Sequence, residues 1–242
     1  GTAVTSTDAG ITIDNTHPTL STPSVVVNNA GGPSDGDTIT MTFTSSTDVT
    51  TAPVCAFTDG SGAMANSAST ASGDATGWTC TIIVDNADQD GAVGYSITFG
   101  DTAGNAGTAV TSTDAGITID NTHPVVTSVT ATDDAYGVGE TLTISVLYDS
   151  VVVVTGTPSL TLSNSATATY SSGSASNTLV FAYVVAEGDS DSTDLSVSSI
   201  TGTVNDEAGN AAGAVSADLG AVTVDGDAPD YLTSTATDGD YG

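Results

Sequence analysis

The chain contains no lysine and no arginine, while 29 of its 242 residues are acidic. Aspartate supplies most of this charge, because glutamate occurs only at Glu140, Glu187 and Glu207. Nucleic-acid binding depends on basic side chains that neutralise phosphates, so we expect no nucleic-acid partner. Anionic membrane surfaces repel such a chain, and we expect no membrane insertion. Clustered carboxylates cannot pair with Lys or Arg here, so they must stay solvated, take up protons or bind metal ions.

Aromatic residues are also scarce, at 5% of the sequence. Sugar-binding sites favour Trp and Tyr platforms, and Trp78 lies in the middle of an expected strand, where we expect it to be part of the core. No nucleophile beside a base, no phosphate-binding loop and no Cys/His zinc spacing is present. Glycosidase-type carboxylate pairs stay open on sequence grounds, because acids occur throughout. We nevertheless expect no enzyme activity.

The only two cysteines are Cys55 and Cys80. Both fall in the first half of the chain, in an acidic sequence rich in Thr and Ser, which favours a disulfide over a metal site. Such a bond would stabilise the fold by about 3 kcal/mol.

The most informative feature that is present is an exact duplication. Residues 1–18 read GTAVTSTDAGITIDNTHP, and residues 107–124 read the same. We interpret the two copies as equivalent positions in successive repeats of a tandem array, and we expect four segments. They are the last strand, around Thr12, and the linker of a preceding repeat (1–18), a repeat that contains the cysteine pair (19–124), a second repeat (125–229) and the first strand of a following repeat (230–242).

Short alternating segments separated by Gly- and Asp-rich turns, without a helical period, predict an all-β fold of tandem immunoglobulin-like β-sandwich domains. In the first repeat we expect strands at residues 24–28, 38–43, 53–57, 77–84 and 93–99. Residues 60–73 are small and polar and predict a long loop with a weak strand. In the second repeat we expect strands at 125–132, 141–148, 166–170, 178–185 and 195–204, and a region at 151–162 that is broken at Gly-Thr-Pro.

Near its end, each repeat carries an Asp-x-Ala-Gly-Asn motif, at residues 101–105 and 206–210. This motif resembles the signature of bacterial immunoglobulin-like repeats in giant surface adhesins. The amino-acid sequence of the second repeat is also similar to repeats of very large secreted bacterial and protist proteins. The resemblance implies an extracellular, cell-surface tandem array that is often stiffened by calcium and acts as a stalk, adhesin extender or filament. Gly104 and Gly209 of the motif are expected at positive φ.

In a sandwich of this strand order, the A–B loop, the E–F loop and the end of strand G lie at one end of a domain. The B–C and F–G loops of the next domain, with Asp149, Asp206 and Asn210, would approach the same junction, which resembles the inter-domain sites of cadherins. Oxygen ligands from several loops suit the six to eight coordination positions of Ca²⁺. The alternative is that these acids only form turns. The candidate ligands are Asp35, Asp37, Asp85, Asp88, Asp90, Asp120, Asn121, Asp133, Asp134, Glu140, Asp149, Glu187, Asp189, Asp191, Asp206, Asn210 and Asp225.

Three functions fit these observations. The first is a structural extracellular stalk or extender whose partners are neighbouring repeats or like subunits, stiffened by Ca²⁺ at the junctions. The second is a glycan- or cell-binding adhesin module, for which residues 60–73 offer the candidate loop. The third is a filament subunit that exchanges strands with its neighbours. His17 and His123, at equivalent linker positions, are interpreted as spacers rather than metal ligands.

Overall fold

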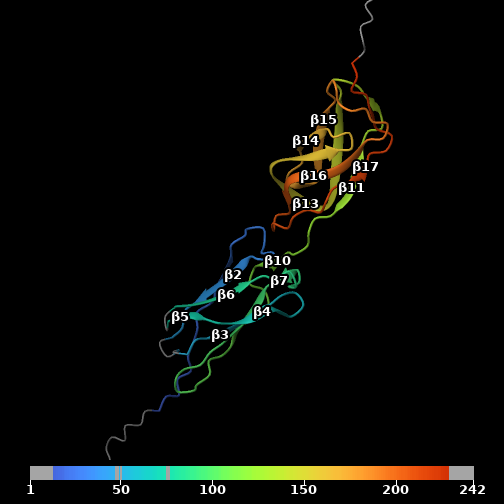
Figure 1. Ribbon diagram of the computed structural model, residues 1–242. Coiled ribbons are helices and arrows are strands. Elements are labelled where there is room, and N and C mark those ends of the chain that lie inside the picture. Colours follow the sequence, from blue (N-terminus) through green and yellow to red (C-terminus); the bar gives the residue numbers. More distant parts are fainter. Residues whose placement is uncertain (1–12, 47–48, 50, 75–76, 229–242) are drawn as a thin grey trace, which may run out of the picture. The chain divides into compact units, whose positions relative to one another are not determined.

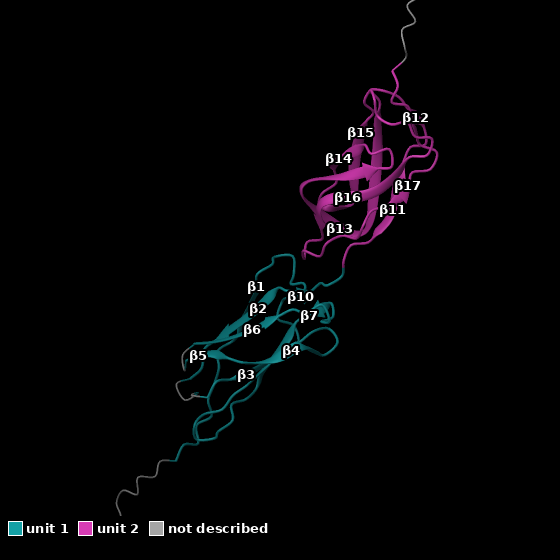
Figure 2. Cartoon of the chain, in the orientation of Figure 1, with its two compact units in different colours: residues 1–122 teal, residues 123–242 magenta. Residues whose placement is uncertain are grey.

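The structure, a computed structural model, describes residues 13–46, 49, 51–74 and 77–228. Within these ranges it contains β-strands and no helix, and thus no helix that could cross a membrane (Figure 1). The chain divides into two compact units, residues 1–122 and 123–242 (Figure 2). The strand expected around Thr12 and the strand expected in 230–242 lie outside the described residues.

Unit 1 is a sandwich of two antiparallel sheets with strand orders β1-β2-β6-β5 and β4-β3-β8-β9, and a small pair, β10-β7, lies beside them. These orders correspond to the A-B-E-D and C′-C-F-G sheets of an immunoglobulin-like domain. The expected fold class is confirmed. The strands of unit 1 are β1 (Ser24–Val27), β2 (Thr38–Phe43), β3 (Val54–Thr58), β4 (Ala63–Thr70), β5 (Ser72–Asp74), β6 (Gly77–Ile83), β7 (Gly91–Ala92), β8 (Gly94–Thr98), β9 (Val110–Ser112) and β10 (Thr118–Ile119).

Unit 2 is built around one long strand, β13, whose first half pairs with β11 and β15 and whose second half pairs with β16 and β14. Because β14 also pairs with β15, the sheet closes around the core on that side. The strands of unit 2 are β11 (Val126–Ala131), β12 (Ala135–Tyr136), β13 (Thr141–Leu162), β14 (Thr167–Ser172), β15 (Ser176–Val184), β16 (Ser196–Asn205), β17 (Ala217–Asp218) and β18 (Thr223–Val224).

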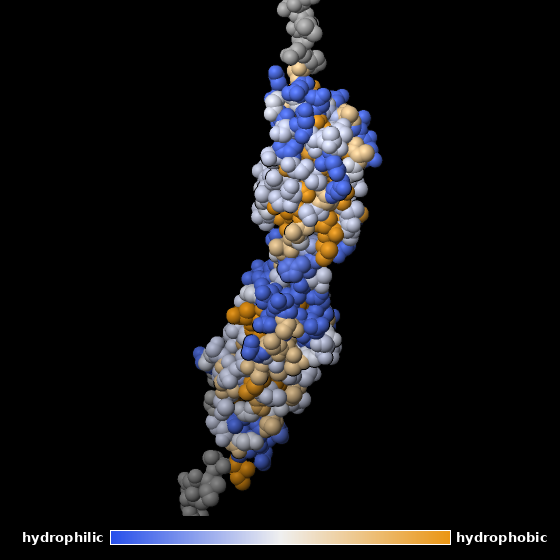
Figure 3. Space-filling model, turned by 45° about the vertical axis from the view of Figure 1, so that its right-hand side comes forward, coloured by the Kyte–Doolittle hydropathy of each residue, from blue (hydrophilic) through white to orange (hydrophobic). Residues whose placement is uncertain are grey.

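The alternation of apolar and polar residues explains why these segments form strands. In β2, Ile39, Met41 and Phe43 are buried, and the threonines between them are partly or fully exposed. The same period in β6 buries Trp78 and Cys80 against them. Each unit therefore has its own hydrophobic core. In Figure 3 the strongly hydrophilic residues gather towards the ends of the units, while their sides are mostly pale or orange.

A disulfide bond joins Cys55 on β3 to Cys80 on β6, with Cα atoms 6.5 Å apart. These strands belong to different sheets, so the bond links the two layers of unit 1 through its core. Trp78 lies two residues from Cys80 on the same buried face, and its indole N–H donates to the Ser45 hydroxyl at 2.9 Å. The aromatic ring and the disulfide therefore share one part of the core.

Two expectations about individual segments were wrong. Residues 60–73 are not a long loop, because most of them form the edge strands β4 and β5, and Met64 is buried. Backbone pairing with β3 and β6 makes these small residues strands. The region 151–162 is not broken at Gly-Thr-Pro either, because β13 runs through it. A register shift between Thr155 and Ser159, with Gly156 at φ 79°, absorbs the proline as a bulge.

Candidate functional site

The E–F turn, which follows β6 in unit 1 and β15 in unit 2, is built in the same way in both units. In unit 1 the N–H of Asp88 donates to the carbonyl of Asp85, and the N–H of Asp85 donates to the Asp88 carboxylate at 2.8 Å. In unit 2 Asp189 and Ala186 make the same two hydrogen bonds. The two turns can therefore be compared position by position, and Asp88 corresponds to Asp189.

In unit 1 this turn is tied to the chain that leaves β10. The N–H of Asn121 donates to Asp90 at 2.6 Å, and the Asn121 side-chain amide donates to the carbonyls of Asp85 and Asp88 at 3.1 and 2.9 Å. The hydroxyl of Thr122 donates to the second carboxylate oxygen of Asp90. Both oxygens of Asp90 thus accept hydrogen bonds from the linker.

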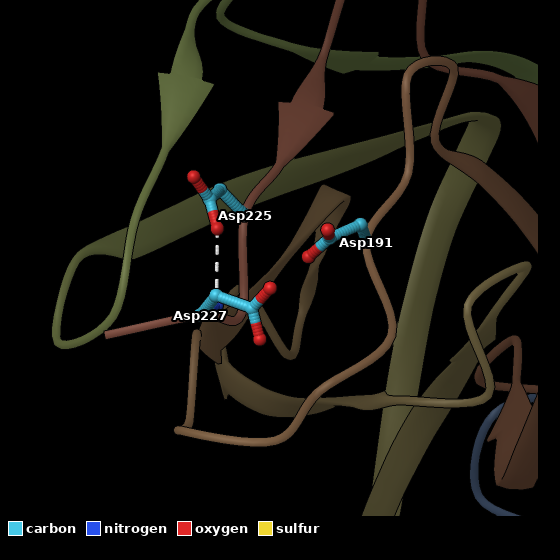
Figure 4. Close-up of side chains that lie close together, drawn as sticks. All are labelled: Asp191, Asp225 and Asp227. Carbon is cyan, nitrogen blue, oxygen red and sulfur yellow. Dashed lines mark hydrogen bonds between the residues drawn. The ribbon is translucent and has the colours of Figure 1, made fainter. Parts of the chain in front are cut away.

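Unit 2 repeats this arrangement in part, with glycine in place of Asn121 and aspartate in place of Thr122. The N–H of Gly226 donates to Asp191 at 2.8 Å, as Asn121 does to Asp90, so Asp227 stands at the position of Thr122. Carboxylate oxygens of Asp191, Asp225 and Asp227 lie within 4.8 Å of one another, and all three residues are exposed. Figure 4 shows them around the last residues of the described chain, where Asp225 accepts the N–H of Asp227 at 3.0 Å. A hydroxyl donor in unit 1 is replaced by a third carboxylate in unit 2.

The other predicted ligands of unit 1 serve mainly as turn acceptors. Asp88 is only 3% exposed and accepts the N–H of Ala65 at 2.6 Å in addition to its bond within the turn. Asp37 accepts the N–H of Ser34 at 3.1 Å, and Asp35 is exposed in the same A–B loop. This loop lies against the site, because the N–H of Asp120 donates to the Pro33 carbonyl at 3.1 Å.

In unit 2, most of the other predicted ligands also accept a backbone N–H, whereas Glu187 is exposed in the E–F turn. The acceptors and their donors are Asp133 from Ala221, Asp134 from Ala135, Glu140 from Gly137, Asp149 from Val125 and Asp189 from Ala186. Asp149 belongs to β13 and not to a loop, so the expected B–C loop position of this residue was wrong.

Asp206 and Asn210 belong to the Asp-x-Ala-Gly-Asn turn, which has the same geometry in both units. The backbone N–H and the side-chain amide of Asn210 donate to the two oxygens of Asp206, both at 2.9 Å. Asp101 and Asn105 make the equivalent bonds, both at 2.8 Å. The side-chain hydrogen bond from Asn105 is the main cause that lowers the pKa of the Asp101 carboxyl below its ordinary value.

Glycine permits this turn. Gly104 and Gly209 adopt φ values of 94° and 100°, as expected from the sequence. The predicted metal role of Asp206 and Asn210 stays a prediction.

The sequence reasoning brought Asp191 and Asp225 into one cluster but omitted Asp227. The missing signal was the alignment of the two linkers, Asn121-Thr-His against Gly226-Asp-Ala. In that alignment a threonine changes to an aspartate beside two acids that are shared by both units.

Tyr183 borders the E–F turn of unit 2. Its pKa predicts how the stability of unit 2 depends on alkaline pH. Burial, and the hydrogen bond that its hydroxyl donates to Asp189 at 2.7 Å, raise the pKa of Tyr183 to about 12. Since the unfolded pKa of tyrosine is about 10, the stabilisation is complete below pH 10 and is lost as the pH rises towards 12. Tyrosines are the only side chains that titrate there, because Lys and Arg are absent and both cysteines are paired. Denaturant unfolding between pH 9 and 11 should show a smaller loss of stability in Tyr183→Phe than in the unaltered chain, and equal losses would contradict this.

No protein-family model and no curated protein matches the sequence. Among solved structures, the chain is similar to a tetra-tandem repeat in the extending region of a large adhesion protein, with 19% identity and a TM-score of 0.31. The match covers 84% of this chain and 50% of that chain, so this chain corresponds to half of that structure. It is also similar to the FN1–FN3 domains of chicken CNTN1 (12% identity, 86% and 67% covered, TM-score 0.35) and to a marsupial T cell receptor (10% identity, 84% and 73% covered, TM-score 0.34).

Proposed function

We propose that this chain is part of an extracellular stalk or adhesin extender, a tandem array of immunoglobulin-like domains whose role is to span distance. The observation that carries the proposal is the duplicated block, which supplies β9, β10 and the following linker to unit 1 and is identical at residues 1–18. An exact repeat of strand G and the linker about one domain length apart is typical of a tandem array of similar domains. The disulfide bond supports an oxidising, extracellular location.

We further propose that calcium binds unit 2 through Asp191, Asp225 and Asp227. Their carboxylates are hard oxygen ligands from two segments of chain, and backbone carbonyls and water can complete the coordination. The chain has no lysine or arginine that could neutralise the cluster instead. The residues thus fit the ion. Bound calcium would join the E–F turn to the chain that leaves strand G and so restrict bending at that end of the unit.

Unit 1 offers a weaker site at the same place. Asp90 and Asp120 are retained, but the hydroxyl of Thr122 already donates to Asp90. We therefore propose that the linker after unit 1 is held mainly by hydrogen bonds and the linker after unit 2 mainly by an ion. The sequence-based idea that ligands from two neighbouring domains share one ion stays a prediction.

The extender role can be tested on the organism that makes the protein. Antibodies against the chain should label intact cells as strongly as permeabilised cells, and deletion of the repeats should shorten the surface structure without abolishing its attachment. A glycan array probed with the whole chain should be negative, since residues 60–73 form paired strands and not a binding loop. Labelling only after permeabilisation would overturn the proposal, and specific glycan binding would favour the adhesin module.

A further inference from the structure

The Asp-x-Ala-Gly-Asn turn does more than close on itself, because in unit 1 it also binds the linker that enters the unit. The side-chain amide of Asn105 donates to the carbonyls of Asp14 and Thr16 at 3.1 and 3.4 Å. Next to it, Nδ1 of His17 donates to the carbonyl of Ala106 at 2.8 Å. These contacts join residues that are 89 to 91 positions apart in the sequence, so they are tertiary contacts and not local turns.

Unit 2 holds its own incoming linker at the same place. Nδ1 of His123 donates to the carbonyl of Ala211 at 2.9 Å, and the N–H of Gly213 donates to the carbonyl of Pro124 at 2.9 Å. The next residue, Val125, is held by the carboxylate of Asp149 at 2.9 Å. Three successive linker residues are therefore bound to the unit that they enter.

The chemistry of the motif suits this task. Asp101 uses both carboxylate oxygens to orient Asn105, and this charge-assisted pair fixes the direction in which the second amide hydrogen points. The turn also presents the Ala106 carbonyl, which can only accept a hydrogen bond, so the histidine must carry its proton on Nδ1. A spacer would need neither a fixed tautomer nor an oriented amide.

From these contacts we infer that the Asp-x-Ala-Gly-Asn turn and the histidine of the linker form a clamp that fixes how the chain enters each unit. The clamp uses hydrogen bonds alone and needs no metal ion. It is thus independent of the calcium site proposed above, which lies where the chain leaves unit 2. His17, His123 and Asn105 are positioning residues in this device, and the histidines are more than spacers.

The two histidines make the test direct, because they are the only ones in the chain. The full chain, labelled with ¹⁵N-histidine, is measured by NMR with EDTA present at a pH of about 8.5, above the range in which imidazole side chains change charge in general. We expect both rings to be protonated on Nδ1 and not on Nε2. A proton on Nε2 in either ring, or a mixture of tautomers as in an unfolded chain, would overturn the inference for that unit.

Variants then test whether the turn acts on the histidine. Asn105→Ala should release His17 to a mixture of tautomers and leave His123 unchanged, so each chain contains its own control. Should Asn105→Ala fail to fold, His123→Phe keeps the Asp206–Asn210 turn intact and removes only the ring N–H. With EDTA present, His123→Phe should speed amide hydrogen exchange at Gly213, whose N–H donates to the Pro124 carbonyl where the chain enters unit 2. An unchanged His17 tautomer in folded Asn105→Ala, or an unchanged exchange rate at Gly213 in His123→Phe, would refute the clamp.

Discussion

Unit 2 should unfold at a higher temperature in calcium than in EDTA, and Asp227→Thr should remove the difference. Extracellular calcium modules bind with a Kd of about 0.1–1 mM, so calcium at about 10 mM is 10 to 100 times the Kd. Binding to the folded state alone then stabilises the unit by about 1.5–3 kcal/mol. For a domain of this size, that corresponds to a rise in Tm of about 10 °C. Calorimetry of the full chain measures it.

The reciprocal substitution in unit 1 is the matched control. Thr122→Asp places a third carboxylate beside Asp90 and Asp120, which reproduces the cluster of unit 2, at the cost of one hydroxyl hydrogen bond. We expect unit 1 to become less stable in EDTA and to gain a response to calcium. The single tryptophan, Trp78, lies in the core of unit 1, so its fluorescence identifies which of the two transitions has moved.

Ionic strength must be matched in these measurements. A formal net charge of −29 is screened by any salt, and screening alone stabilises a strongly charged chain. The comparison is therefore calcium against sodium chloride of equal ionic strength. A unit 2 transition that does not distinguish the two salts would reject the site. If the calcium response persists in Asp227→Thr, the ion binds at other carboxylates of the chain.

The fold was predictable wherever a strand is buried on one face. The segments Thr38–Phe43 and Gly77–Ile83 alternate strictly, and the structure buries the apolar residues of each. The strands that were missed have no such signal. Ala63–Thr70 is an edge strand with small side chains, and what makes it a strand is its hydrogen bonding to the preceding strand β3, which the pattern of apolar residues does not report. The bulge at Gly156 could not be foreseen for a similar reason, because a Gly-Thr-Pro sequence fits a loop as well as a bulged strand.

The candidate site was predictable as a region and not as a set of ligands. Acids in the E–F turn and after strand G do come together, because the strand order of the sandwich requires it. Which of them are available to an ion depends on hydrogen bonds that composition does not reveal. Asp88 and Asp189 hold the turn, whereas Asp191 and Asp225 face a third carboxylate. The denser cluster of unit 2 comes from the linker, where Asp227 stands in place of Thr122.

Reduction of the Cys55–Cys80 disulfide should destabilise unit 1 and leave unit 2 unchanged. The bond spans 25 positions of sequence, and opening a loop of this length costs about 3 kcal/mol. In a domain of about 100 residues this lowers Tm by roughly 15 °C. Trp78 fluorescence follows unit 1 during heating with and without a reductant, while calorimetry follows unit 2, which has no cysteine.

A chain with both cysteines replaced by alanine separates the covalent effect from the reductant itself. The unfolding transition that Trp78 fluorescence reports should have a low midpoint temperature, and reductant should not change it, because the cross-link between the sheets is already absent. If the unaltered chain keeps the same Trp78 midpoint after complete reduction, burial of the two side chains in the core holds the layers together without the bond. The stability of unit 1 would then rest on the same alternation of apolar residues that forms unit 2, which folds around its core with no disulfide at all.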